Sequence, residues 1–392
     1  MQSENQKQKD SFNQFENYSP GHQITPDVKK KRFVKINAWL HKYRVIVLIF
    51  VILLCLGIGG FLINGFRSLV FYSSTGDPVV LKKEAKIYSP LTGVEVSEAD
   101  TKRPVTAIMI ENSPDARPQS GLKESGVVFE AIAEGGITRF LTLHQEDQPQ
   151  IIGPIRSLRP YYIDWLAAFD PSVAHVGGSV NALSEIRNGK YKDIDQFFNG
   201  PSYWRAKDRY APHNVYTSFE KLDALNQKKG FTTSKFTGFP RVEEAPLTKK
   251  KPKLKATSTP APESATTINV TISSPIYNSS YTYDASTKLY ARSEGGKVHT
   301  DREKGAIAPK VVIVIESPVT QVLEDGYREQ YKTIGSGKAT VFQNGVVTIG
   351  TWSKSSKNDQ IKFKNSDGQD INLERGQTWI TASDPSKSVT WK

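Results

Sequence analysis

The longest apolar stretch of the chain lies near its N-terminus. Residues 45–63 read VIVLIFVILLCLGIGGFLI and carry no charge. A helix of this length spans about 28 Å, which is close to the hydrocarbon thickness of a bilayer. Lysines and arginines crowd the segment before this run, whereas only Arg67 follows it closely. By the positive-inside rule, this pattern predicts an uncleaved signal anchor, with residues 1–44 as a disordered basic cytoplasmic tail and everything after residue 63 outside the membrane.

Strand and helix patterns alternate in residues 88–240, after a stalk at 64–87. Short apolar runs between turn residues predict strands, and apolar residues at helical spacing predict helices. Gly135-Gly136 predicts a two-residue hairpin turn. The region is expected to be an α+β or α/β domain. Strands are expected at 105–111, 127–134, 137–145 and 173–176, and helices at 160–169, 180–187 and 219–228.

Residues 267–392 show mostly strand patterns, and a Lys/Pro-rich linker at 241–266 precedes them. Asn344-Gly345 is the residue pair that best supports a type I′ turn. The region is expected to be a second, mostly β domain, built as a small sandwich or barrel. Its strands are expected at 268–272, 311–316, 328–334, 339–343, 346–352, 361–364 and 371–373.

Charge and cysteine content narrow the function classes. The chain has 392 residues, a net charge of +12 and one cysteine, Cys55. An intramolecular disulfide is therefore excluded, and no cysteine–histidine spacing for zinc exists. Cys55 follows Leu54 inside the apolar run, which favours an inert membrane cysteine over a lipidated one. The moderately basic exterior favours anionic partners such as cell-wall polymers, lipid headgroups or nucleic acid, whereas charge taken alone favours the alternative that it serves solubility. No cofactor or metal is expected, and nucleic acid is not an expected partner of an exterior domain.

The predicted hairpin places charged side chains together. With a two-residue turn, Glu130, Glu134 and Arg139 are expected on one face, because cross-strand partners share a face. The functional interpretation is a polar site in which the arginine orients an acid. The alternative is a solvated face with cross-strand salt bridges.

The segment GPIRSLRP at 153–160 precedes a predicted helix. Pro160 suits the first turn of that helix, and Ser157 can cap near its start. Arg156 and Arg159 beside a helix N-terminus could hold a phosphate or a carboxylate. The alternative is that the two arginines pair with internal acids such as Asp164 or Asp170.

Two further segments carry candidate ligand-binding residues. His175 and Ser179 flank a glycine turn that leads from a strand into a helix. This turn lacks the lysine of a P-loop, and Ser179 also fits an ordinary N-cap. Arg209 and His213 belong to the basic and aromatic segment RAKDRYAPH at 205–213, where His213 could act in acid–base chemistry or bind an anion.

Several long motifs resemble the YerB-like family of bacterial envelope lipoproteins. They are RPVTAIMIEN (103–112), EGGITRF (134–140), GPIRSLRPYY (153–162), HVGGS (175–179), APHNVYT (211–217), ATVFQNGVVTIGTW (339–352) and LERGQTWI (373–380). The resemblance covers about residues 88–392 in order. It implies an extracytoplasmic, membrane-attached protein of two domains and no established reaction. This chain departs from the family by its predicted helical anchor in place of a lipid.

Three functions remain open from the sequence. The leading hypothesis is an accessory protein that binds an anionic envelope ligand or cell-wall polymer through Arg156 and Arg159. A glycan hydrolase or transferase would instead use paired carboxylates, with Glu111, Glu130, Glu134 and His213 as candidates. A protein that docks an envelope partner through exposed tryptophans is the third. The tryptophans considered for that role are Trp352, Trp379 and Trp391.

Overall fold

The computed structural model describes residues 86–243, 262–321 and 329–392. The predicted cytoplasmic tail, the apolar run at 45–63 and most of the linker lie outside these ranges. Within the described part of the chain, no helix is both long and apolar enough to cross a bilayer. Residues 85–392 form one compact unit.

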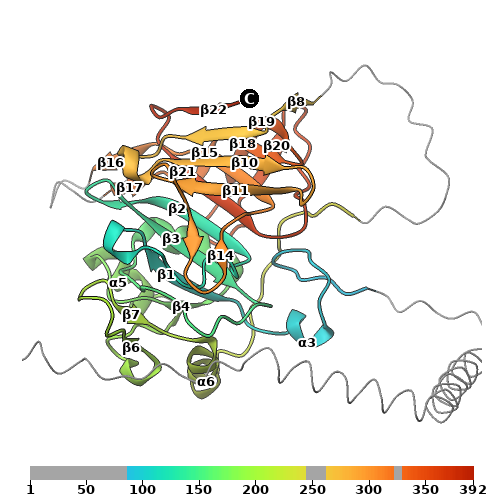
Figure 1. Cartoon of the computed structure of the whole chain (residues 1–392). Helices are drawn as coiled ribbons and strands as arrows, with labels where there is room; N and C mark the ends of the chain where they lie inside the picture. The colour runs from blue at the N-terminus through green and yellow to red at the C-terminus, as the bar shows by residue number, and fades with distance from the viewer. Residues whose placement is uncertain (1–85, 244–261, 322–328) are drawn as a thin grey trace, which may run out of the picture. The chain divides into compact units, whose positions relative to one another are not determined.

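One mixed sheet of eleven strands runs through both predicted domains (Figure 1). The two halves meet where β2 (Val127–Glu134) pairs in parallel with β21 (Thr378–Ser383), with Val127 opposite Thr378. The two predicted domains are thus joined by backbone hydrogen bonds. Along the sheet the order is β20 (Lys362–Asn365), β19 (Val346–Lys354), β18 (Gly335–Gln343), β15 (Val311–Glu316), β21, β2, β3 (Ile137–His144), β1 (Thr106–Glu111), β4 (Ser172–Ala174) and β5 (Lys192–Asp193), and β8 (Glu263–Ser264) pairs with β19.

Apolar side chains fill both faces of this sheet. On one face, a single core runs from Met109 and Phe129 in the N-terminal half to Ile313 and Ile380 in the C-terminal half. Helix α4 (Pro160–Leu166) packs there, and Trp165 stacks on Phe129 with ring centroids 5.5 Å apart. A continuous core of this kind favours cooperative unfolding of the two halves.

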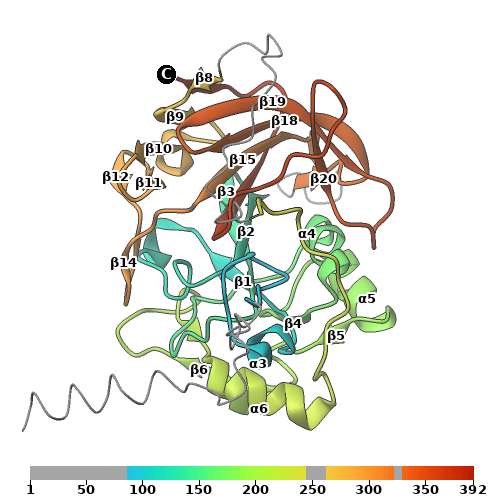
Figure 2. The ribbon, with the colours of Figure 1, turned by 90° about the vertical axis from the view of Figure 1, so that its right-hand side faces the viewer.

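Different layers cover the opposite face in the two halves. Helix α6 (Phe219–Lys229) covers the N-terminal half through residues such as Phe219 and Leu222. A five-stranded sheet covers the C-terminal half, where Tyr281 and Tyr290 pack on Val312 and Phe342. Figure 2 shows this second sheet on one side of the molecule and α4 with α5 (Val180–Asn188) on the other. The second sheet runs β12 (Lys297–Val298), β11 (Leu289–Glu294), β10 (Ser279–Asp284), β9 (Thr267–Val270) and β22 (Val389–Trp391).

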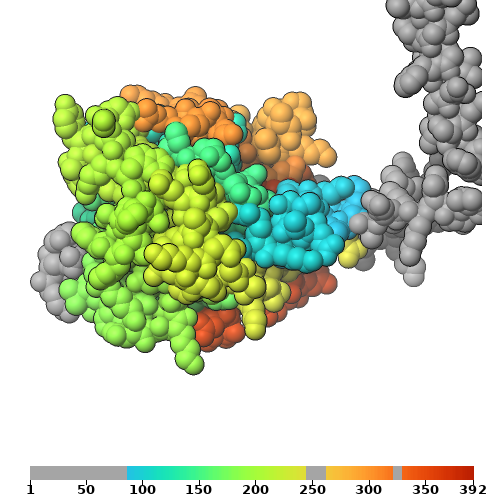
Figure 3. All heavy atoms as spheres, turned by 90° about the horizontal axis from the view of Figure 1, so that it is seen from below, coloured from blue at the N-terminus to red at the C-terminus, as the bar shows by residue number. Residues whose placement is uncertain are grey.

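Short elements complete the described part of the fold. Seen from below, the surface is formed mainly by the green and yellow-green residues of the N-terminal half (Figure 3). The remaining helix and strand pairs are α3 (Glu98–Thr101), β6 (Trp204–Arg205) with β7 (Val215–Tyr216), β13 (Thr300–Asp301) with β14 (Gly305–Ala306), and β16 (Val319–Gln321) with β17 (Glu329–Tyr331).

The predicted class is confirmed for the described region: the first half mixes helices and strands, and the second is mostly β. Both predicted hairpin turns are confirmed, since Gly135, Gly136, Asn344 and Gly345 all have positive φ. The strand expected at 371–373 is wrong, because Leu373 makes only an isolated bridge to Arg241. The prediction missed the buried strand β21 and the pair β10 and β11.

The expected register of the first hairpin is also wrong. A bulge between Ile132 and Glu134 shifts the pairing by one residue, so that Arg139 lies opposite Ala131. The bulge is stabilised at Ile132, whose N–H donates to the Tyr331 hydroxyl and whose carbonyl accepts from the Tyr161 hydroxyl. A shift of one residue moves a side chain to the other face of a sheet. Glu130 therefore lies on the face opposite to Arg139.

Candidate functional site

Polar side chains gather around Glu111, the last residue of β1. Its buried carboxylate oxygen Oε1 accepts a hydrogen bond from the Ser113 hydroxyl at 3.0 Å. His213 Nδ1 lies 2.8 Å from the same oxygen, and Arg156 Nε lies 3.2 Å from it. We call Glu111, Ser113, Arg156 and His213 the Glu111 cluster. One carboxylate oxygen thus positions a histidine and an arginine side by side.

Backbone hydrogen bonds bring these residues together. The amide of Glu111 donates to the Pro154 carbonyl, and the amide of Arg156 donates to the Met109 carbonyl, both at 2.9 Å. The segment around Ile155 therefore runs antiparallel beside the end of β1. His213 arrives on the loop between β6 and β7, three residues after Tyr210, whose carbonyl accepts from its amide.

The outer edge of the cluster faces solvent. The side chains of Arg156 and His213 are 25% and 22% exposed, whereas that of Glu111 is 4% exposed. Within the described part of the chain, no hydrogen bond uses either terminal nitrogen of Arg156. His213 Nε2 lies 4.0 Å from the exposed carboxylate of Asp115. The cluster therefore places two partly exposed side chains above a buried carboxylate, and the Arg156 guanidinium carries donors that no described group uses.

The other arginine of the same segment belongs to a different group. Arg159 and Arg139 both donate to Glu134, Arg139 at 2.7 Å, and all three are largely buried. Burial raises the pKa of Glu134, but Arg139 and Arg159 outweigh that effect and hold it below its ordinary value. Arg139 also donates to the Ser157 carbonyl at 2.8 Å. The salt bridge between Glu134 and Arg139 is present, but the expectation of a solvated face is wrong because both side chains are largely buried.

Arg156 and Arg159 thus pair with internal acids, but with Glu111 and Glu134 instead of Asp164 and Asp170. Arg159 occupies the N-cap position of α4 and Pro160 the first helical position, as expected for proline. The expected capping by Ser157 is wrong, because no side chain caps this helix.

Glu130 lies in a third group, which connects the two halves. Both of its carboxylate oxygens accept from Arg292 Nη2, at 3.0 and 3.1 Å, and Trp379 Nε1 donates to one of them at 2.9 Å. Arg292 also lies over the Trp379 ring, 4.3 Å from its centroid. Glu294 lies beside this pair, and burial raises its pKa to about 7. Glu130 is inaccessible to solvent, so it cannot reach a substrate.

The remaining predicted site residues have structural contacts. His175 is fully buried, with Nδ1 at 2.7 Å from the Gly177 carbonyl and Nε2 at 3.0 Å from Asp193. Ser179 stands at the N-cap of α5 as predicted, but its hydroxyl makes no capping hydrogen bond. Arg209 donates to the backbone carbonyls of Asp115 and Pro118, so it holds the loop that carries Asp115.

Exposed aromatic side chains lie on two loops of the N-terminal half. Phe197, Phe198 and Tyr210 are all exposed. Phe197 lies beside Gly177, whose carbonyl accepts from the Leu158 amide two residues after Arg156.

Among the described residues, no group of three or more histidine, cysteine or acidic side chains could hold a metal ion.

Comparisons with known proteins identify the family. Residues 91–232 match the N-terminal domain, and residues 268–380 the C-terminal domain, of a protein family of unknown function, DUF3048. A protein of Bacillus subtilis (strain 168) named "Putative lipoprotein YerB" is 33% identical over 301 residues, which are 75% of this chain and 86% of that protein. The chain belongs to this YerB-like family.

A solved structure in the YerB-like family has the same fold. The crystal structure of the YerB protein from Bacillus subtilis matches with a TM-score of 0.68 and 29% identity, over 78% of this chain and 100% of that chain. Strand β2 lies within the match to the N-terminal family domain, and residues 378–380 of β21 lie within the match to the C-terminal one. Because β2 pairs with β21, the two family domains are two halves of one sheet. The family resemblance of the sequence motifs is confirmed.

The sequence analysis did not single out Ser113, Asp115 or Arg292, the partner of Glu130. Ser113 and Asp115 follow directly after the buried strand β1, and polar residues at a strand end could have drawn attention to them. Nothing local distinguishes Arg292, because its partner Glu130 lies 162 positions away.

Proposed function

We propose that this protein is attached to the membrane and that its folded part lies on the extracytoplasmic side. The Glu111 cluster would bind an anionic group of an envelope polymer. Membrane attachment is supported by the uncharged run at 45–63 and by the lipoprotein name of the Bacillus relative. Because Cys55 lies inside that run, the proposal assigns attachment to the helix and not to a lipid.

The observation that carries the proposal is the position of the Arg156 guanidinium. Its terminal nitrogens have no hydrogen-bond partner in the described ranges, whereas Arg139 and Arg159 are both bound to Glu134. Arg156 and His213 contact the same oxygen of Glu111, so an oxyanion on the Arg156 guanidinium could also accept a hydrogen bond from His213 Nε2 when the imidazole is protonated. A guanidinium with free donors suits a carboxylate or phosphate.

The arrangement of acids favours binding over glycan hydrolysis. A hydrolase needs two carboxyls that flank one bond. Glu130 and Glu134 lie on opposite faces of the sheet, and each is bound to arginine. The lowered pKa of Glu134 also opposes a role as a general acid.

A co-sedimentation experiment tests the proposal. The full-length chain, purified in detergent, is mixed with purified peptidoglycan and with peptidoglycan whose carboxyl groups have been converted to amides. The wild type should sediment with the untreated polymer only. Arg156→Gln should weaken retention about tenfold, because it removes a charge-assisted bidentate contact.

The control is Lys338→Gln, which removes an exposed cation paired with Glu316 on the C-terminal half and should leave retention unchanged. Equal retention of wild type and Arg156→Gln would refute the assignment of the site. Equal binding to amidated and untreated polymer would refute the anionic ligand.

A further inference from the structure

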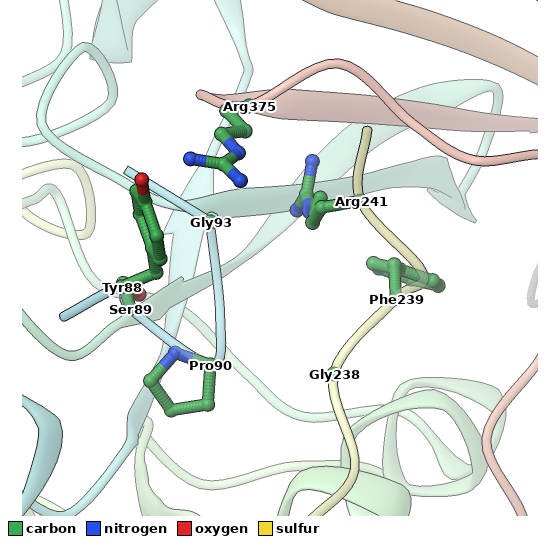
Figure 4. A pocket seen from close by; sticks show the side chains of 8 residues that line it. All are labelled: Tyr88, Ser89, Pro90, Gly93, Gly238, Phe239, Arg241 and Arg375. Atoms are coloured by element: carbon green, nitrogen blue, oxygen red, sulfur yellow. The ribbon is translucent and has the colours of Figure 1, made fainter. Parts of the chain in front are cut away.

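A cavity of about 280 Å³ lies between the first described residues of the chain and the junction of its two halves (Figure 4). Its walls come from residues 88–93, from residues 238–241 and from Arg375, which precedes β21. Tyr88, Pro90 and Phe239 form its apolar walls, and Arg241 and Arg375 supply two cations. None of these residues belongs to the Glu111 cluster, so this site is independent of the function proposed above.

Arg241 is a buried cation without a counterion in the described part of the chain. Its Nη1 donates to the Glu374 carbonyl at 2.8 Å and to the Thr378 hydroxyl at 3.0 Å, and its Nη2 donates to the Leu91 carbonyl at 2.7 Å. Its Nε is buried and has no hydrogen-bond partner. No described carboxylate forms an ion pair with it. These neutral acceptors hold the guanidinium in place but do not neutralise its charge.

Burial lowers the pKa of Arg241 to about 10, as expected for a cation in a poorly solvated site. The charge of Glu146 acts in the opposite direction. The Glu146 carboxylate is itself engaged by the hydroxyls of Ser89 and Thr92. A bound anion would therefore supply the charge that the surrounding residues do not provide.

The second arginine is placed beside the first. Gly93 has a φ of +75°, and a side chain at this position would meet Cγ of Arg241 at 2.7 Å and Cγ of Arg375 at 3.1 Å. Glycine thus lets the stems of both arginines pass close to the backbone. Arg375 lies over the Tyr88 ring, 3.8 Å from its centroid, and its Nε donates to the Val242 carbonyl at 2.9 Å. Figure 4 shows both guanidinium groups on the same side of the cavity.

We propose that this cavity, here called the Arg241 cavity, binds a small amphipathic oxyanion, with its carboxylate or phosphate on Arg241 and Arg375. Its apolar part would lie against Phe239 and Pro90. The volume lies just below the usual range of ligand sites, about 300–1,000 Å³, so it suits a single ring or a short side chain.

Titration of arginine signals tests the site. The full-length chain, labelled with ¹⁵N-arginine and kept in detergent micelles, is titrated with benzoate, phenyl phosphate and neutral benzyl alcohol. The Nε–H signal of Arg241, assigned by its loss in Arg241→Lys, should shift saturably with at least one anion and not with benzyl alcohol. The stronger of the two anions identifies the oxyanion class.

Two variants complete the test. Arg375→Gln should weaken binding of the effective anion about tenfold. Arg187→Gln, at an arginine of α5 paired with Asp195, should leave the affinity unchanged. The proposal is overturned if the wild-type Arg241 signal moves with neither anion, or if benzyl alcohol moves it equally. Equal affinity of wild type and Arg375→Gln would overturn it as well. The peptidoglycan experiment above reports on Arg156 alone, so failure of one proposal is distinguishable from failure of the other.

Discussion

Glu130 Oε1 and Arg292 Nη2 lie 3.0 Å apart, and neither side chain is exposed to solvent. The carboxylate belongs to β2 in the N-terminal half and the guanidinium to β11 in the C-terminal half. Trp379 donates to Glu130, and Tyr281 accepts from Arg292. The ion pair therefore joins the two halves where β2 and β21 already share a ladder.

Glu130→Gln should destabilise the protein strongly. The substitution keeps the shape of the side chain but removes the nearer carboxylate from the buried Arg292 charge, which then has only Glu294, 3.4 Å away, beside it. Removal of one partner of a buried pair costs about 3–5 kcal/mol in free energy of unfolding. Urea denaturation followed by tryptophan fluorescence measures this loss, and both halves should unfold in one transition.

The matched control is Lys102→Gln, which breaks the exposed pair of Lys102 with Glu98 on α3. Its effect should stay within about 0.5 kcal/mol. A loss below about 1 kcal/mol for Glu130→Gln would show that the pair does not hold the halves together.

Glu294 should make stability depend on pH. Burial is the largest cause that raises its pKa, from 4.5 to about 7, with Arg292 opposing and Glu130 adding to the effect. A raised pKa in the folded state means that the contribution to stability is complete below about pH 4.5 and is lost as pH rises through about 7. The shift corresponds to about 3 kcal/mol.

Glu294→Gln provides the comparison, because glutamine is a neutral isostere that can still accept from Asn112. The difference in free energy of unfolding, wild type minus variant, should fall by about 3 kcal/mol between pH 4.5 and pH 8. Groups common to both proteins largely cancel in this difference. Parallel pH profiles would show that Glu294 titrates normally.

The first hairpin should tolerate substitution at one glycine and not at the other. Gly135 has a φ of +57°, and the space that a side chain would occupy there is open, so Gly135→Asn should cost less than about 0.5 kcal/mol. At Gly136, φ is +77° and a Cβ would lie 2.8 Å from the Ser273 hydroxyl, which donates to the Gly136 carbonyl. Gly136→Val should therefore cost about 2 kcal/mol or more. Thermal unfolding of the two variants distinguishes them, and equal melting temperatures would contradict the turn geometry.

The buried group around Glu134 should show strong coupling. A double-mutant cycle with Glu134→Gln and Arg159→Gln is expected to give an interaction free energy of about 1–3 kcal/mol. The same cycle at the exposed pair Glu98–Lys102 should give about 0.3–0.5 kcal/mol. A coupling at Glu134 no larger than at the exposed pair would show that Arg139 alone satisfies the carboxylate.

The sequence predicted several elements of the fold because their signals are local. Strand β2 spans Val127–Glu134 as expected, and helix α5 begins at Val180 as expected. Both hairpin turns follow from residues that accept positive φ. Strands β10 and β11 were missed because they are interrupted by polar residues on their exposed side, and β21 because its short run TWITAS carries little alternation.

The candidate site was predicted only in part, for a physical reason. Arg156 and His213 were singled out as residue types suited to anions, but their meeting at Glu111 depends on long-range backbone pairing. The grouping of Glu130 with Arg139 failed because the bulge at Ile132 depends on hydroxyls of Tyr161 and Tyr331, which the local hairpin pattern does not contain.

The sequence alone determined the local features: the uncharged run at 45–63, the turns at glycine and asparagine, and several buried strands in both halves. Tertiary structure decided which charges meet. Trp352 and Trp379, which were considered as docking residues, are buried in the core. Arg292 pairs with Glu130 only because β11 packs over the junction of β2 with β21. Propensity and periodicity act over a few residues, whereas ion pairing in a core depends on the three-dimensional path of the whole chain.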